Sequence, residues 1–328
     1  MASPGQSTLF NAFSELASTT FRNHDKQVKD NVSNHNALYR RLREKGNTTL
    51  LDGGLSIVKT LDYADNSTYK RYSGYDALDI SAVDVLSAAE FPWRQVAVNL
   101  AASGLELRTN SGESAFIRFL KAKLKNAQRS FANGLSTDIY SDGTASNQIG
   151  GLQALVSDLG TGTVGGINSS THSFWLSILQ SAAAPLGGGS AITPSATTIE
   201  SLMLPLWIAL TRGMDMPDFI VMSDNYFTFY EQSQTSLKRY TSDENGNGGM
   251  VSMKYKNADV FFDSSGGIPT SHAYFLNTEY LELVAHRDAN ITVMEEMKSI
   301  NQDAVVIPIL FQGNLVVGNR SLQGVLKA

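Results

Sequence analysis

The sequence predicts an α+β protein from which one long segment projects. Three observations support this fold class. Apolar residues recur at helical spacing between Ser111 and Gly143, and short runs rich in Val, Ile and Leu, which are typical of strands, recur along the chain. Residues 62–93, with polar turns and scattered aromatic side chains, separate two of these runs. A segment of that length is unusual inside a compact domain, so we expect a two-stranded excursion with a function of its own.

The composition limits what the chain can do. Its 328 residues are 42% hydrophobic and 17% charged, enough for one large or two medium cores. A net charge of −5 argues against a dedicated nucleic-acid-binding protein, which would carry a basic domain. Without cysteine, the chain has no disulfide, no thiolate metal site and no cysteine nucleophile. We find no signal-peptide pattern, and the longest apolar run, Leu202 to Leu210, is far shorter than the about 20 residues that span a bilayer. We therefore expect a cytoplasmic protein with no membrane partner.

The N-terminal segment is predicted to be an arm that neighbouring molecules hold in place. Residues 1–50 are polar, and their apolar positions are sparse. Asn36 to Asn47 predicts a short helix, because Leu38 and Leu42 lie four residues apart and Gly46 provides a C-terminal stop. Such a segment buries little surface alone, so it needs outside contacts to be ordered.

The clearest predicted helix covers residues 111–143. One face is apolar at helical spacing, with Ile117, Leu120, Leu124, Ala127, Phe131 and Leu135. The opposite face is basic, with Arg118, Lys121, Lys125 and Arg129. A basic face of this kind is expected of the solvated side of an amphipathic helix, and it is compatible with weak, non-specific attraction to a polyanion.

The rest of the chain predicts short helices and strands. Helices are predicted over 195–213 and 224–240, and strands over 55–61, 94–103, 218–223, 258–263 and 273–284. Pro205 lies inside the first of these helices, and Asp224 is the expected cap of the second. Residues 303–326 predict a hairpin that turns at the Gln-Gly-Asn triplet 312–314, followed by a final strand.

Two glycine-rich motifs resemble ligand-binding loops only in part. GTGTVG at 160–165 fits G-x-G-x-x-G, but a dinucleotide site needs an acidic residue about 20 positions later, and none occurs between Ile167 and Ile199. DENGNG at 243–248 fits the start of a calcium loop, but Lys254 occupies the position that requires a bidentate glutamate. We therefore expect a flexible glycine turn and a solvated surface loop.

No residue pattern predicts catalysis. The five histidines lack metal-ligand spacing and are His24, His35, His172, His272 and His286. No G-x-S-x-G elbow accompanies His172 or His272, and the adjacent Glu295 and Glu296 are expected to form a solvated face. We expect no catalytic, cofactor-binding or metal site, and an enzyme that uses His172 or His272 is the least supported alternative.

Four stretches occur together in a recognisable order. They are NALYRRLREKGNTTLLDGG (36–54), YSGYDALDISAVDVLSAAEFPWRQVAV (72–98), NQIGGLQALV (147–156) with VGGINSSTHSFW (164–175), and GNRSLQGVL (318–326). Jointly they resemble the major capsid proteins of tailed bacteriophages with the Hong Kong 97-type fold. The resemblance implies an N-arm, an extended E-loop hairpin, a P-domain with a long spine helix, and an A-domain. It assigns 1–51 to the N-arm, 52–103 to the E-loop, 104–145 and 279–320 to the P-domain, and 146–278 and 321–328 to the A-domain.

The same resemblance implies a structural protein without catalysis. Copies of the chain would form the hexamers and pentamers of an icosahedral shell that encloses the double-stranded DNA of a tailed phage, assembled in the host cytoplasm. Further expected partners are the packaged DNA, by weak non-specific contact, and a portal protein. The sequence lacks a long N-terminal extension that could act as a scaffold, which favours a separate scaffolding protein or none, and a decoration protein is left open. The alternative is an encapsulin-like compartment that encloses a cargo enzyme.

The resemblance also implies where copies touch. The E-loop would lie over a neighbouring subunit, and the candidate assembly contacts are Leu38, Leu42, Tyr75, Phe91, Pro92 and Trp93. The alternative for Trp93 is packing at the root of its own hairpin, against its own P-domain. The DNA-facing candidates are the four basic residues Arg118, Lys121, Lys125 and Arg129.

Some relatives join an E-loop lysine covalently to a P-domain asparagine of the next subunit. Lys59, Lys70 and Asn301 provide the residue types here. The reaction needs a desolvated, neutral lysine and a nearby carboxylate base, whereas the sequence around Lys70 is polar and basic. We therefore expect no cross-link.

Overall fold

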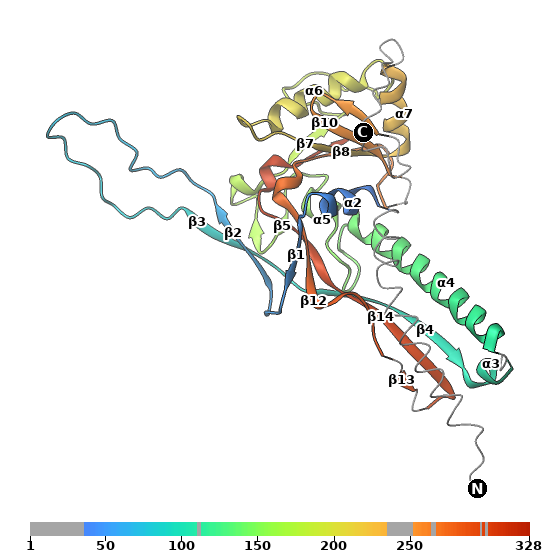
Figure 1. Ribbon diagram of the computed structural model, residues 1–328. Helices are drawn as coiled ribbons and strands as arrows, with labels where there is room; N and C mark the ends of the chain where they lie inside the picture. Colours follow the sequence, from blue (N-terminus) through green and yellow to red (C-terminus); the bar gives the residue numbers. More distant parts are fainter. Residues whose placement is uncertain (1–35, 110–112, 235–251, 264–266, 296, 299–300) are drawn as a thin grey trace, which may run out of the picture.

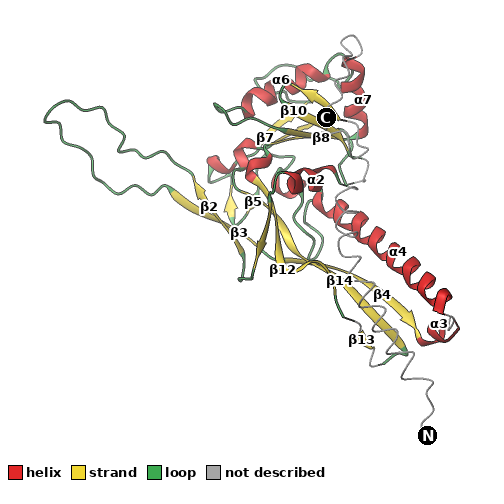
Figure 2. Cartoon of the chain, viewed as in Figure 1, coloured by secondary structure: helices red, strands yellow, loops and turns green. Residues whose placement is uncertain are grey.

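Two β-sheets, one above the other in Figure 1, organise the computed structural model. The model describes residues 36–109, 113–234, 252–263, 267–295, 297–298 and 301–328, but not the side chains of 107–109 and 113–122. A hairpin projects to one side of the body, and a long helix runs along the other (Figure 2). This mixed architecture confirms the predicted α+β class. The calcium-like motif at 243–248 lies outside the described residues.

The lower sheet holds five strands, ordered β1-β12-β14-β13, with β4 also paired to β14. Their bounds are β1 Thr48–Leu51, β4 Arg94–Ser103, β12 Leu281–Val293, β13 Met297–Lys298 and β14 Ala304–Val317. Helix α4, Glu113–Ile139, packs against β4, and the short helix α3, Gly104–Thr109, leads into it (Figure 1). The predicted strand 94–103 is confirmed at both ends, and the long helix is confirmed with slightly shorter bounds.

The predicted hairpin at 312–314 is wrong. β14 continues through the triplet as one strand of 14 residues, in which Gly313 pairs with Ala285 of β12 and with Arg94 of β4. A strand with a neighbour on each side keeps an extended backbone whatever turn chemistry its sequence offers locally. The final strand, β15 Gly324–Lys327, is confirmed.

The upper sheet holds six strands in the order β7-β15-β11-β8-β10-β9. Their bounds are β7 Ile178–Ser181, β8 Phe219–Met222, β9 Ser252–Tyr255, β10 Ala258–Phe262, β11 His272–Leu276 and β15 as above. Helices α6, Ile199–Leu210, and α7, Asp224–Ser233, contribute apolar side chains to a second core with this sheet. The predicted helix over 195–213 is confirmed with Pro205 inside it.

Two details of this part differ from the prediction. Ser223, not Asp224, is the N-cap of α7, and residues 235–240 of the predicted helix lie outside the described residues. The predicted strand over 273–284 is two strands, because the 3-10 turn Thr278–Tyr280 separates β11 from β12. That break passes the chain from the upper sheet to the lower one.

The apolar face of α4 is confirmed where its side chains are described. Leu124, Ala127, Phe131 and Leu135 are buried in the main core. Ile117 and Leu120 belong to the part of α4 whose side chains are not described. The short helix α2, Ala37–Glu44, also forms as predicted: the Asn36 side chain caps its N-terminus, and Gly46, with a φ of 75°, follows its end.

Candidate assembly surface

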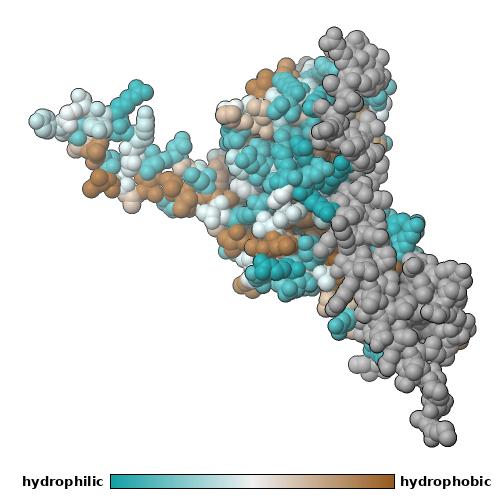
Figure 3. All heavy atoms as spheres, viewed as in Figure 1, coloured by the Kyte–Doolittle hydropathy of each residue, from teal (hydrophilic) through white to brown (hydrophobic). Residues whose placement is uncertain are grey.

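A two-stranded hairpin carries several of the strongly exposed apolar side chains of the described residues. Strand β2, Ile57–Asp62, pairs antiparallel with β3, Leu86–Phe91. Residues 63–85 between them have no regular structure and extend far from the body (Figure 1). Tyr75 is completely exposed, Ile80 is 94% exposed, and Tyr69, Tyr72 and Leu78 are also exposed. Figure 3 shows apolar surface along this projecting segment.

The root of the hairpin, in contrast, belongs to the subunit's own core. Ile57, Leu61, Ala89 and Phe91 lie on one face of the ribbon and are buried, whereas the opposite face is mostly exposed. Phe91 is only 4% exposed and contributes to the main core. Phe91 is therefore a core residue of this subunit. It is not exposed for contact with a neighbouring subunit, contrary to the expectation from the sequence.

Trp93 also packs within its own chain. Its indole Nε1 donates to the Gly54 carbonyl at 3.0 Å, and its ring meets the His286 ring edge-on at 5.9 Å. The adjacent Pro92 ring is exposed, while its carbonyl accepts from Asn314 Nδ2 at 2.9 Å. This geometry fits the alternative in which Trp93 fastens the root of its own hairpin.

Helix α2 is fastened to the upper sheet by a cluster of charges. Arg41 lies 3.3 Å from both Asp218 and Asp259, and the Lys45 ammonium also pairs with Asp218. Burial alone would raise the pKa of Asp218, but hydrogen bonds from Lys45 and Thr278 outweigh it and lower the pKa. The carboxylate is thus held in its charged form between arm and sheet.

The apolar side of α2 is buried in the same subunit. Leu38 is fully buried, and Leu42 is 1% exposed. Both are therefore core residues of this subunit in the structure, rather than exposed contacts. Of the six contact candidates, Tyr75 and Pro92 alone have exposed side chains, and Trp93 is partly buried.

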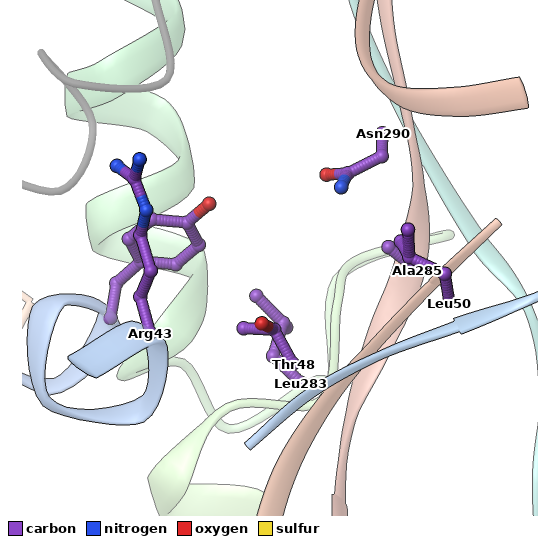
Figure 4. A pocket seen from close by; sticks show the side chains of 7 residues that line it. Arg43, Thr48, Leu50, Leu283, Ala285 and Asn290 are labelled. Carbon is purple, nitrogen blue, oxygen red and sulfur yellow. The ribbon is translucent and has the colours of Figure 1, made fainter. Parts of the chain in front are cut away.

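A pocket lies between α2, β1 and β12 (Figure 4). Its lining residues are Tyr39, Arg43, Thr48, Leu50, Leu283, Ala285 and Asn290. Arg43 and Asn290 lie on opposite sides of it (Figure 4). Burial raises the pKa of Tyr39, and the charge of Arg43 partly offsets this. The seven lining residues include no carboxylate and no imidazole.

The histidines proposed for the least supported alternative are held in structural contacts. His272 Nδ1 lies 2.8 Å from the Thr270 carbonyl, and its Nε2 lies 3.0 Å from Asp158 Oδ2. The His172 ring lies 5.8 Å from the Phe174 ring. No group of three or more His, Asp or Glu side chains suited to a metal ion occurs among the described residues.

The basic face of α4 is described only in its second half. Lys125 and Arg129 are exposed. The side chains of Arg118 and Lys121 lie outside the described residues. The DNA-facing role of all four remains a prediction.

None of the helices in the described ranges has the length and apolar character needed to cross a bilayer.

Arg320 holds residues 155–175 in place, and no sequence pattern predicted this role. Arg320 is fully buried, and its guanidinium donates to the Leu155 and Trp175 carbonyls at 2.6 and 3.2 Å and to the Ser157 and Ser169 hydroxyls at 3.3 Å. Burial lowers its pKa to about 10. The arginine therefore connects residues 155–175 to the segment that follows β14. In the sequence, only its position within GNRSLQGVL (318–326) indicated a role for it.

No family model and no curated protein matches the chain, but solved structures do. A chain of the cyanophage A-1(L) capsid asymmetric unit aligns with a TM-score of 0.65 and 16% identity, over 85% of this chain and 89% of that one. The capsid of an empty GTA particle aligns with a TM-score of 0.56 and 12% identity, over 87% and 88%. A chain of the satellite phage P4 procapsid, which includes a size determination protein, gives 0.52 and 8%, over 98% and 97%.

The chain has a phage-capsid fold. The fold expected from the four sequence stretches is thereby confirmed at the level of the whole architecture. At 8 to 16% identity the likeness concerns the capsid fold, so the roles of single residues must come from this chain's own geometry.

Proposed function

We propose that the protein is a major capsid protein whose copies assemble into a closed icosahedral shell around double-stranded DNA, as part of a virion. The observation that carries the proposal is the projecting hairpin, whose loop leaves Tyr69, Tyr72, Tyr75, Leu78 and Ile80 exposed. Soluble proteins rarely leave large apolar side chains on an unsupported loop, because such surface is stabilised by burial against a partner. The capsid fold supplies the partner class: further copies of the same chain.

The domain boundaries follow from the same proposal. Residues 52–103 act as the E-loop, and α4 is the spine helix of a P-domain that covers 104–145 and 279–320. The upper sheet belongs to an A-domain of 146–278 and 321–328, and 1–51 form an N-arm. Lys125 and Arg129 on α4 make weak contact with packaged DNA, a portal protein completes the particle, and either a separate scaffolding protein or none assists its assembly.

Electron microscopy of the purified full-length protein tests this function directly. We expect closed shells of uniform diameter that protect double-stranded DNA from nuclease when isolated from phage-producing cells. A protein that remains monomeric under assembly conditions contradicts the proposal. Shells that contain an enzyme and no DNA would instead support the encapsulin-like alternative.

A loop replacement separates assembly from folding. Residues 64–84 are replaced by a short glycine-serine linker, which keeps Tyr63 and Val85, whose backbones are hydrogen-bonded at 3.1 Å. We expect a folded, soluble subunit that forms no shells. The contrasting deletion of 62–90 also removes Ala89, which is fully buried, and is expected to destabilise the subunit. Normal shells from the 64–84 replacement would show that the loop is not an assembly element.

A further inference from the structure

The glycine motif at 160–165 lies against the projecting hairpin. It contributes to a small hairpin of β5, Thr163–Val164, and β6, Ile167–Asn168. Gly165 and Gly166 form its turn with φ values of 58° and 78°, the positive values that a tight two-residue hairpin turn of type I′ requires. The Glu90 N–H of β3 donates to the Gly165 carbonyl at 2.9 Å. The turn is therefore hydrogen-bonded to the root of the excursion.

The fit between this turn and β3 leaves no room for a side chain at position 165. A Cβ on Gly165 would lie 2.8 Å from Ala89 Cβ and 3.1 Å from Phe91 Cζ. A Cβ on Gly166, the other turn residue, would meet no atom within 4 Å. Both positions favour glycine for their backbone conformation, but only Gly165 is also needed for the close approach.

A second contact joins the projecting hairpin to the body at the end of its other strand, β2. Tyr63, the first residue after β2, stacks on Phe174 with ring centroids 5.0 Å apart and an interplanar angle of 28°. The next residue, Trp175, donates its indole N–H to the Val164 carbonyl of β5 at 2.9 Å. The small hairpin and the 3-10 turn Ser173–Trp175 thus form one unit that touches both strands of the excursion.

We propose that this unit is a bracket that sets the direction in which the loop 63–85 leaves the subunit. The inference rests on the proposed function, because a loop that must reach a second copy binds with less loss of conformational entropy when its direction is fixed beforehand. A two-stranded ribbon is marginally stable by itself, so an excursion of this length needs support at its root. Gly165, Tyr63 and Phe174 are positioning residues: they direct the loop without touching the neighbouring copy.

The test measures loop direction in the dilute full-length subunit. The chain has no cysteine, so the exposed pair Ser67→Cys and Ser201→Cys accepts two spin labels, one on the loop and one on α6. We expect one narrow distance distribution for the parent protein. Gly165→Ala should broaden or shift it and reduce the yield of uniform shells. Gly166→Ala imposes comparable backbone strain without the clash and should keep both properties close to those of the parent.

A rescue variant sharpens the comparison. Ala89→Gly removes the methyl group that a Cβ at position 165 would meet, so Gly165→Ala with Ala89→Gly should recover most of the narrow distribution. Equal distributions for Gly165→Ala and Gly166→Ala, or a Gly165→Ala protein that is folded and unchanged in distance, would overturn the proposal.

If Gly165→Ala does not fold, a second pair of variants tests whether the bracket sets the direction of the loop. Tyr63→Ala removes the stack on Phe174, whereas Tyr63→Phe keeps the ring and loses only the hydroxyl that donates to the Asp84 carbonyl at 3.0 Å. We expect a broadened distribution for Tyr63→Ala alone, and a parent-like distribution for Tyr63→Ala overturns the bracket. A parent protein that forms no shells refutes the proposed function instead, while the distance distributions still decide the bracket.

Discussion

Gly313 and Val284 lie on neighbouring strands so closely that a Cβ at position 313 would be 2.4 Å from the Val284 carbonyl oxygen. Gly313→Ala should therefore force β12 and β14 apart and lower the free energy of unfolding by about 2 kcal/mol or more. Urea unfolding of the dilute subunit measures this loss. Gly318→Ala is the matched control, because its nearest contact would be the Tyr280 carbonyl at 3.8 Å. Equal stability of the two variants would contradict the close approach.

The same glycine shows where prediction from the sequence fails. Local patterns predicted the elements that depend on local signals, such as the amphipathic α4, the strand at 94–103 and the glycine stop after α2. The triplet at 312–314 has turn chemistry, yet two neighbouring strands keep it extended. That glycine serves a close approach between strands, which no local pattern distinguishes from a turn.

The projecting segment follows from the sequence, whereas the burial of several candidate contact residues does not. The excursion itself followed from its length and composition, and Tyr75 is exposed as a contact residue must be. Phe91, Leu38 and Leu42 were misplaced because apolar character alone does not tell a core position from a contact position. The pairing of β2 with β3 and the role of the glycine motif depend on contacts between distant segments, which one sequence does not reveal.

Arg320 should be irreplaceable even by lysine. Its guanidinium donates to acceptors on four residues, all of them neutral, and a lysine ammonium on a different stem cannot reach the same set. Arg320→Lys should lower the free energy of unfolding by about 3 kcal/mol, because buried acceptors lose their donors. Thermal and urea unfolding measure the change. Arg71→Lys, at an exposed position, should leave stability unchanged; a similar loss at both sites would contradict the prediction.

Asp218 should make the subunit sensitive to acid. Burial would raise its pKa, but hydrogen bonds from Lys45 and Thr278 lower it below the ordinary value of 3.8. A carboxylate with a lowered folded-state pKa stabilises the fold above its ordinary pKa, and that stabilisation disappears as the pH falls through the folded-state value. The free energy of unfolding, measured between about pH 6 and about pH 3, should therefore fall less steeply for Asp218→Asn than for the parent. Asp65→Asn, at an exposed loop position, is the control and should reproduce the parent's slope; an unchanged slope for Asp218→Asn would contradict the assignment.

Assembled shells should contain no covalent link between subunits. The Lys59 ammonium is already engaged with Glu282 of its own subunit, at the root of the excursion. Lys70 is exposed and donates to the Ala77 carbonyl at 3.1 Å, so it lies in water rather than in the desolvated environment that the reaction needs. Asn301 and Glu295 are exposed as well, and Glu296 lies outside the described residues, so neither the asparagine nor Glu295 is in the desolvated environment that the reaction needs. Shells boiled in detergent should run on a denaturing gel as a single band at 35.5 kDa. A ladder of larger bands that disappears with Lys59→Ala or Lys70→Ala, but persists with the α4 control Lys125→Ala, would show that the lysine becomes desolvated and reactive only in the assembled shell.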